Sequence, residues 1–332
     1  MPFPILRTPF IVLSEIISLL EPNEIVTASF CSKNVQRLLE RHYQRRKPVE
    51  WRLVMQDYDS RGRVKIRTSE GGKGITVMSV RPISELSEEL QAKAKRNGYM
   101  LMFNTQFVTA YMENQMMTAK SVVNTIRQLF NLDVFAVVMD TNGTWAIDWI
   151  NNRQEMILGG IEFYRNPKDH SNADETVDYV LRNARFSLYC NIDGNVSDNF
   201  KFNGKLGPMR QLWIKSNGHW VTCDNLMNFD SITILIEGSR LSVSDLNSFL
   251  RHWRAGASAR LEYLRLIFEE HTFIERFDEE LEVVKTDEKK IFRRSSDEWE
   301  WKFQGGYSIQ RLDGVKAMIQ CGPRWLLMGV CH

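Results

Sequence analysis

The first apolar pattern in the chain, within residues 3–45, has the spacing of amphipathic helices. Beginning after Pro9, apolar residues recur about every 3.6 positions and share one helix face, at Val12, Leu13, Ile16, Ile17 and Leu20. Pro22 ends this helix, and Asn23 and Ser32 stand where each can cap one further short helix. Three helices of this size bury too little surface to be stable alone, so the pattern predicts a partner, or packing on the rest of the chain.

Residues 49–83 show the alternation of apolar and polar positions that is typical of β-strands. The apolar segments, separated by polar or glycine-containing turns, are residues 51–55, 64–68 and 75–78. This spacing predicts a β-meander. The following residues, 84–98, are polar and are expected to form a helix that ends at Gly98.

From residue 118 onward, segments with helical spacing alternate with strand-like segments. Helices are predicted around residues 122–130 and 177–181, and strands at residues 134–139, 186–190, 212–214, 232–236 and 264–268. Thr222 is placed to cap one further helix. The best-defined helix has Ser242 as its cap, with Asp245 three residues later as in a capping box, and it ends at Gly256. Its apolar face consists of Leu246, Phe249, Leu250 and Trp253.

The spacing between successive strands, roughly 20 to 30 residues, is the period expected when each strand is followed by a returning helix and parallel units stack. The pattern as a whole predicts an α+β or α/β fold, in which three N-terminal helices precede an irregular, leucine-rich-repeat-like α/β domain. An open parallel sheet with helices on both faces is the alternative, since both architectures use right-handed crossovers. We expect three segments: residues 1–48, a connecting β-rich region at residues 49–117, and a repeat-like domain at residues 118–332.

Charged side chains dominate residues 270–300, which predicts a solvated loop or an exposed helix. Residues 299–303 then alternate, a turn is expected at Gly305–Gly306, and residues 307–311 return, which is the pattern of a β-hairpin. Residues 325–330 predict a terminal strand.

The composition limits the kinds of partner. The chain has 332 residues with 43 basic and 41 acidic side chains, and its net charge of +2 gives no overall attraction for nucleic acid or an anionic membrane. The chain has five cysteines, an odd number, and no two of them have a C-x-x-C spacing. Neither a disulfide framework nor a zinc site is therefore expected, and reduced thiols in a cytoplasmic or nuclear protein fit better. Residues 132–150 are apolar but contain three aspartates, so they are not expected to span a bilayer. We expect neither nucleic acid nor a membrane as a partner.

Sequence motifs for catalysis are missing, so we assign no catalytic, cofactor-binding or metal-binding residue and expect a protein that is not an enzyme. The run from Gly71 to Gly74 lacks the Ser or Thr that follows the lysine of a phosphate loop. None of the six histidines has a partner at a spacing suited to metal ligation. Cys190 and Cys223 would need a histidine brought close by folding to act as nucleophiles, and a buried structural thiol is the alternative.

Tryptophan is concentrated in the C-terminal part of the chain, where it suggests a binding face. Trp299 and Trp301 share one strand face beside the charged segment, and with His219 and Trp220 they are the candidates for binding a protein substrate. The alternative is that tryptophans fill the core. This is the expectation for Trp213 and Trp253.

The N-terminal segment resembles the F-box. That motif has Leu-Pro, an apolar helix ending near a second proline, a short helix, and a Cys or Ser followed by a basic residue. The matching stretches are residues 3–6, 8–20, 21–26 and 28–33. Thr8 stands in place of the usual leucine before Pro9, which leaves the apolar helix face intact.

The C-terminal half is similar to the F-box-associated domain that accompanies this motif in large nematode families. The matching stretches are residues 220–226, 241–253 and 261–264.

The resemblance implies that the N-terminal helices dock on a Skp1-related adaptor, and through it on a cullin, while the C-terminal domain presents a protein substrate for ubiquitination and degradation. The adaptor-binding residues would be Pro9, Val12, Leu13, Ile16, Ile17, Leu20, Pro22 and Ile25. The substrate face is expected on the strand side, or on the loops, of residues 210–310.

Three alternatives remain open. The apolar helix face packs only on the chain's own second domain, the chain is a binding scaffold that works without a ligase, or the chain is an enzyme whose site is assembled only by folding.

Overall fold

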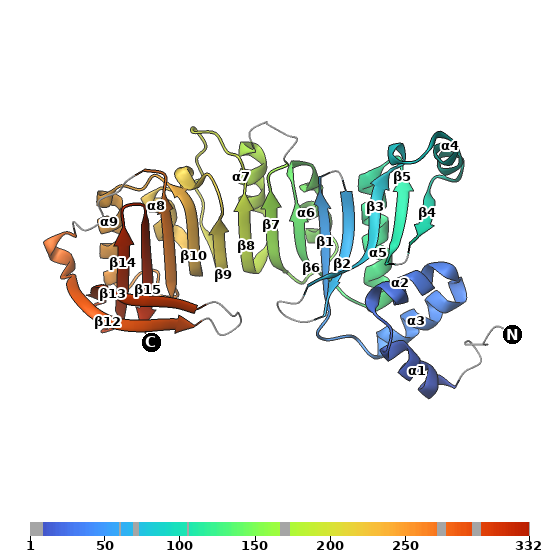
Figure 1. Cartoon of the computed structure of the whole chain (residues 1–332), viewed down its shortest axis with the longest axis horizontal. Coiled ribbons are helices and arrows are strands. Elements are labelled where there is room, and N and C mark those ends of the chain that lie inside the picture. The colour runs from blue at the N-terminus through green and yellow to red at the C-terminus, as the bar shows by residue number, and fades with distance from the viewer. Residues whose placement is uncertain are drawn as a thin grey trace. The chain divides into compact units, whose positions relative to one another are not determined.

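The computed structural model describes residues 9–59, 61–68, 73–104, 106–166, 173–270, 277–293 and 300–331. The chain forms two compact units, Met1–Gly143 (unit 1) and Thr144–His332 (unit 2), and each contains helices and a set of paired strands (Figure 1). The expected mixed α/β class is therefore confirmed. Among the helices of the described residues, none is long and apolar enough to cross a bilayer.

Unit 1 begins with three helices: α1 (Phe10–Ser18), α2 (Pro22–Cys31) and α3 (Lys33–Arg45). Their caps differ from the sequence prediction. Pro22 is the first residue of α2, and the backbone N–H of Glu21 donates to the Glu24 carboxylate at 2.8 Å. Asn23 is instead used in a tertiary contact, because its side-chain amide donates to the carbonyl of Gln106 at 2.7 Å. Ser32 does occupy the N-cap position of α3, but its side chain makes no capping hydrogen bond.

The strands of unit 1 lie in the order β6-β1-β2-β3-β5-β4. Their bounds are β1 (Arg52–Tyr58), β2 (Arg61–Arg67), β3 (Ile75–Pro82), β4 (Met100–Phe103), β5 (Val108–Met112) and β6 (Val134–Met139). The predicted meander is confirmed, because β1, β2 and β3 pair antiparallel in sequence order. β6 pairs parallel with β1 and β5 pairs parallel with β3, while β4 pairs antiparallel with β5.

Helices cover this sheet and enclose a core. A short turn, η2 (Ile83–Glu85), precedes α4 (Glu88–Asn97), which ends at Gly98 as predicted, with that glycine in the left-handed conformation. α5 (Gln115–Phe130) packs against β2, β3 and β5, and α2 packs against β3. The turn η3 (Thr141–Gly143) follows β6. The sequence analysis placed a helix around residues 122–130 and a strand at residues 134–139 in the C-terminal segment. In the structure the corresponding α5 and β6 pack and pair within unit 1.

Five strands of unit 2 run parallel and stand side by side in chain order. They are β7 (Leu158–Tyr164), β8 (Phe186–Asp193), β9 (Leu206–Ile214), β10 (Phe229–Ser239) and β11 (Tyr263–Phe268). The helices of this unit are α6 (Trp145–Asn151), α7 (Asp174–Asn183), α8 (Cys223–Asn228) and α9 (Val243–Arg254), with a turn η4 (Gly218–Trp220) before α8.

In Figure 1 these helices lie behind the strands, on one face of the sheet. The connections between strands are unequal: residues 194–205, which the structure describes throughout, join β8 to β9 without a helix. Unit 2 is therefore an α/β unit with parallel strands and with its helices on one face of the sheet. Its relationship to leucine-rich repeats stays a prediction.

The helix caps and the apolar helix face that the sequence predicted in unit 2 are present in the structure. Thr222 and Ser242 cap α8 and α9, and both helices have the reciprocal hydrogen bonds of a capping box. The predicted apolar face of α9 is buried, including Leu246, Phe249 and Trp253. The strands bury residues at alternate positions on one side, as in β10, whose Ile234 and Ile236 are almost fully buried.

The last strands form an antiparallel extension of this sheet. They are β12 (Val284–Arg293), β13 (Glu300–Gln310), β14 (Lys316–Gly322) and β15 (Trp325–Cys331), and β15 pairs antiparallel with β11. The predicted terminal strand is confirmed. The charged stretch at residues 270–300 is partly strand, because the described part of it contains the turn η5 (Glu279–Leu281) and β12.

The predicted hairpin at Gly305–Gly306 is wrong. Both glycines lie inside the single strand β13, with φ of 80° and 123°. Glycine is needed here because a side chain at Gly306 would collide with the carbonyl oxygen of Ile319. The glycines allow β13 to bend, so that its first half and β12 run across the ends of the other strands, as Figure 1 shows.

Candidate functional site

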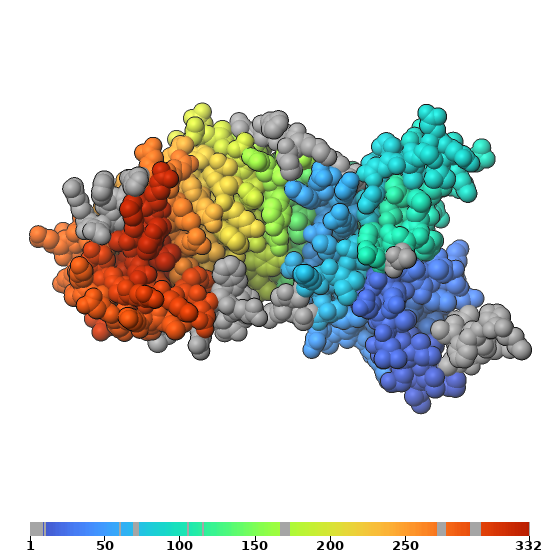
Figure 2. Space-filling view, viewed as in Figure 1, coloured from blue at the N-terminus to red at the C-terminus, as the bar shows by residue number. Residues whose placement is uncertain are grey.

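The strand face of unit 2 that lies opposite its helices is formed by two rows of residues, most of them polar or aromatic. Parallel pairing sets these rows, because residues in register on neighbouring strands point to the same side. The first row is Gly160, Tyr189, Gln211, Thr233 and Tyr263, and the second is Glu162, Asn191, Trp213, Leu235 and Arg265. In the space-filling view the surface over β8 to β10, yellow-green to yellow-orange, is visible beside the orange-to-red final strands (Figure 2).

Interactions with two neighbouring side chains, Tyr164 and Lys215, help to fix residues of the second row. The Tyr164 hydroxyl donates to Glu162 at 2.8 Å, and burial together with this carboxylate raises the pKa of Tyr164 well above its usual value. The Lys215 ammonium lies 4.9 Å from the centre of the Tyr164 ring and 4.6 Å from that of Trp213. Trp213, which the sequence analysis expected in the core, is half-buried on this face.

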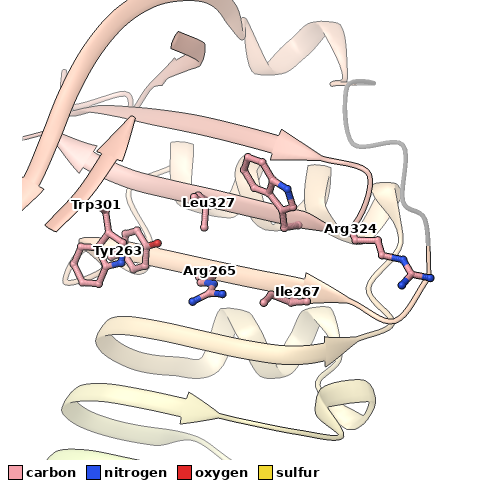
Figure 3. A pocket seen from close by; sticks show the side chains of 7 residues that line it. Tyr263, Arg265, Ile267, Trp301, Arg324 and Leu327 are labelled. Atoms are coloured by element: carbon pink, nitrogen blue, oxygen red, sulfur yellow. The ribbon is translucent and has the colours of Figure 1, made fainter. Parts of the chain in front are cut away.

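A pocket of about 400 Å³ opens on the same face, where the bent strand β13 meets β11 and β15. Its lining residues are Tyr263, Arg265, Ile267, Trp301, Arg324, Trp325 and Leu327. Figure 3 shows these side chains gathered over β11 and β15, with Trp301 and Tyr263 at one end and Arg324 at the other. The pocket is thus built by residues that are far apart in the sequence.

Strand register and one ring stack hold the pocket together. Arg265 lies opposite Leu327, and Ile267 lies opposite Trp325, in the antiparallel pairing of β11 with β15. Trp301 stacks on Tyr263 with ring centres 4.0 Å apart and planes 17° apart, so the first half of β13 closes one end. Burial raises the pKa of Tyr263 to about 12, and the nearby charge of Arg265 acts in the opposite direction.

The structure separates the four residues predicted to bind substrate. Trp301 lines the pocket, and Trp299 lies outside the described residues. Trp220 is only 3% exposed, because its indole packs edge-on against Phe200, Phe202 and Phe229. It leaves almost no surface for a partner to contact.

His219 belongs to a charged cluster at the carboxyl ends of the parallel strands. Its side chain is 5% exposed, and its Nε2 lies 3.0 Å from the carbonyl oxygen of Ser197. Arg240 bridges Asp198 and Glu269 in the same cluster, at 2.7 and 2.6 Å. Arg240 holds the pKa of Asp198 below its usual range. These contacts join four successive loops, which indicates a structural role for the cluster.

The predicted adaptor-binding residues of unit 1 fall into two groups. Four of them pack inside the unit: Leu13, Ile17, Pro22 and Ile25. Pro9 and Val12 are exposed, and Ile16 and Leu20 are half-buried. The sequence analysis missed two further exposed apolar side chains, Ile11 on α1 at 77% and Leu19, the residue directly after α1, at 83%. Val12, Ile16 and Leu19 are spaced i, i+4, i+7, so their helical spacing in the sequence could have predicted this second apolar stripe.

The sequence analysis also missed most of the pocket. Arg265 and Ile267 alternate with the buried Leu264, Leu266 and Phe268 of β11, and that alternation could have marked them as one face. Arg324 and Leu327 carried no comparable signal, because their position depends on which strand pairs with β11.

The other groups that could carry chemistry are metal-ligating side chains and the thiols of Cys190 and Cys223. Within the described parts of the chain, no three His, Cys, Asp or Glu side chains are grouped as metal ligands. Burial raises the pKa of Cys190 to about 12 and that of Cys223 to about 11, so both remain thiols at neutral pH. Cys223 donates to the carbonyl oxygen of Asp245 at 3.2 Å.

The fold and this face define unit 2 as a one-sided α/β unit with an open strand surface. Residues 202–266, from the segment before β9 to β11, match the model of a family described as F-box associated. The match supports a domain of the F-box-associated type at this place in the chain. No curated protein and no solved structure matches the chain.

Proposed function

We propose that this protein is the substrate-recognition subunit of a Skp1–cullin–F-box ubiquitin ligase and that it is not itself an enzyme. In this proposal α1 to α3 dock on a Skp1-related adaptor, which brings the cullin, and the strand face of unit 2 holds a protein target. The observation that carries the proposal is the match of residues 202–266 to the F-box-associated family.

The exposed apolar stripe of α1 supports the docking step. Val12 is 48% exposed and Leu19 is 83% exposed, and neither is needed to fill the core of unit 1. Large apolar side chains at helical spacing on a surface are typical of a helix that completes its packing with a partner. The stripe of Val12, Ile16 and Leu19 is therefore the contact we assign to the adaptor.

We expect the double substitution Val12→Asp plus Leu19→Asp to weaken binding of a Skp1-related adaptor by about a hundredfold, because two apolar contacts are lost and two charges are desolvated. The fold should persist, since both side chains are exposed. Affinity between the two purified proteins, measured by calorimetry, tests this. The same change at polar surface positions of α4, Lys93→Asp plus Lys95→Asp, is the matched control and should leave the affinity unchanged.

Unchanged adaptor binding by the α1 variant would refute the docking step. A change at Leu13 or Ile25 cannot serve this purpose, because these buried side chains support unit 1 itself.

The second candidate is a binding scaffold that works without a ligase. It is favoured by the burial of Leu13, Ile17 and Ile25, which shows part of the predicted docking face packed within its own unit. A scaffold predicts that a partner of unit 2 keeps the same abundance when the proteasome is inhibited. A ligase subunit predicts that its target accumulates.

A further inference from the structure

The pocket on the strand face of unit 2 combines two chemistries that a general contact surface does not need. One part is apolar, formed by Ile267, Trp325 and Leu327. The other consists of two guanidinium groups, from Arg265 on β11 and Arg324 beside β15. A ligand that fills this pocket has to carry negative charge next to an apolar group.

The two arginines carry charge that the described residues leave uncompensated. Other surface arginines of unit 2, such as Arg240, Arg251 and Arg260, are each paired with a carboxylate. Arg265 and Arg324 have no such ion pair with any described residue. Arg265 in addition lies in register between two leucines, Leu235 and Leu327. An arginine in these surroundings gains most from a carboxylate that a partner supplies.

The spacing of the lining residues fits an extended ligand. Arg265 and Ile267 are two residues apart on one strand face, a separation of about 6.6 Å. Figure 3 shows Ile267 between Arg265 and Arg324 along the pocket. An extended peptide presents alternate side chains at the same interval, so that an acidic, an apolar and a second acidic side chain match the three positions.

We propose that this pocket binds an acidic peptide segment of the target protein, with carboxylate side chains on Arg265 and Arg324 and an apolar side chain between them. The inference deepens the proposed function, since it names the class of substrate for the same face. Binding of the peptide itself requires neither adaptor nor cullin, so the two can be tested apart.

The test uses the full chain and a short fluorescent peptide with blocked ends. The peptide has glutamate, leucine and glutamate at alternate positions, with serine between them. We expect saturable binding in fluorescence anisotropy, weakened as salt rises because the contacts are ionic. A matched peptide with glutamine in place of both glutamates should bind about tenfold or more weakly.

Substitutions in the pocket test the assignment. Arg265→Gln and Arg324→Gln should each weaken binding of the glutamate peptide about tenfold, since each removes a charged hydrogen bond and keeps most of the side chain. Arg260→Gln, which changes an arginine already paired with Asp230, is the matched control and should bind like the unchanged protein. Thermal unfolding of each variant checks that the fold is retained.

Equal binding of the glutamine and glutamate peptides would overturn the inference, as would equal binding by the pocket variants and the Arg260→Gln control. The Val12→Asp plus Leu19→Asp protein should keep its peptide affinity. Loss of adaptor binding with peptide binding intact separates the docking proposal from this one, and failure of either leaves the other standing.

Discussion

Two glycines shape the part of the protein where the pocket forms. Gly305 and Gly306 adopt positive φ within β13, a conformation that side chains with a Cβ adopt with strain. Because β13 bends there, Trp301 reaches the ring of Tyr263. The neighbouring strand β12 places Phe292 over Gly329, where a Cβ added to the glycine would lie 2.8 Å from the Phe292 ring. The backbone requirement at these glycines therefore helps to set the shape of the pocket.

We expect Gly306→Ala to destabilise unit 2 by about 3 kcal/mol, because backbone strain and a collision with the carbonyl of Ile319 add together. The control is Gly314→Ala: Gly314 also has positive φ, but the nearest atom to an added Cβ is a side-chain nitrogen of Gln310 at 3.9 Å. That change should cost about 1 kcal/mol. Chemical denaturation of both variants measures the difference, and equal costs would contradict the role assigned to Gly306.

Helix ends show how an element uses only some of the capping residues that its sequence offers. Ser242 accepts from the backbone N–H of Asp245, and the Asp245 carboxylate accepts from that of Ser242 at 2.9 Å. Ser32 stands at the equivalent position of α3 without such a bond. The two serines differ in whether an acidic side chain follows three residues later, since Val35 occupies that place after Ser32.

We expect Ser242→Ala to lower the free energy of unfolding by about 1 kcal/mol, since it removes the cap of α9. Ser32→Ala should cost only a few tenths of a kcal/mol. Hydrogen exchange at the first amides of each helix measures both effects locally. A loss of protection at α3 as large as that at α9 would show that Ser32 does cap its helix.

At the scale of the whole molecule, the proposed function needs both units on one chain. Unit 1 carries the exposed stripe of α1, and unit 2 carries the strand face with its pocket. An adaptor of this kind acts by bringing a target close to the ligase, so each end is expected to bind without the other and both are needed for degradation.

We therefore expect cells that produce the Val12→Asp plus Leu19→Asp protein to accumulate the target of unit 2, because the target is still bound but no longer delivered. Abundance of proteins captured by unit 2, measured with and without proteasome inhibition, tests this. The Lys93→Asp plus Lys95→Asp protein should behave like the unchanged chain. A target whose abundance is the same in all cases would favour the scaffold function.

Local signals in the sequence determined the elements whose causes are local. The period of Leu246, Phe249 and Trp253 predicts α9, and its cap and end follow from Ser242 and Gly256. The meander of β1 to β3 and the left-handed end of α4 at Gly98 were likewise predictable, because alternation and glycine act within a few residues.

Only the tertiary structure decided where the proposed binding surfaces lie. It placed Leu13 and Ile25 inside unit 1 and left Val12 and Leu19 outside, a choice that depends on which neighbours cover each side of a helix. In the structure, the segment predicted as a hairpin is the single bent strand β13, and Arg265, Trp301 and Arg324 line one pocket. Strand pairing between residues far apart in the chain sets these contacts, and periodicity within a short segment carries no information about such pairing.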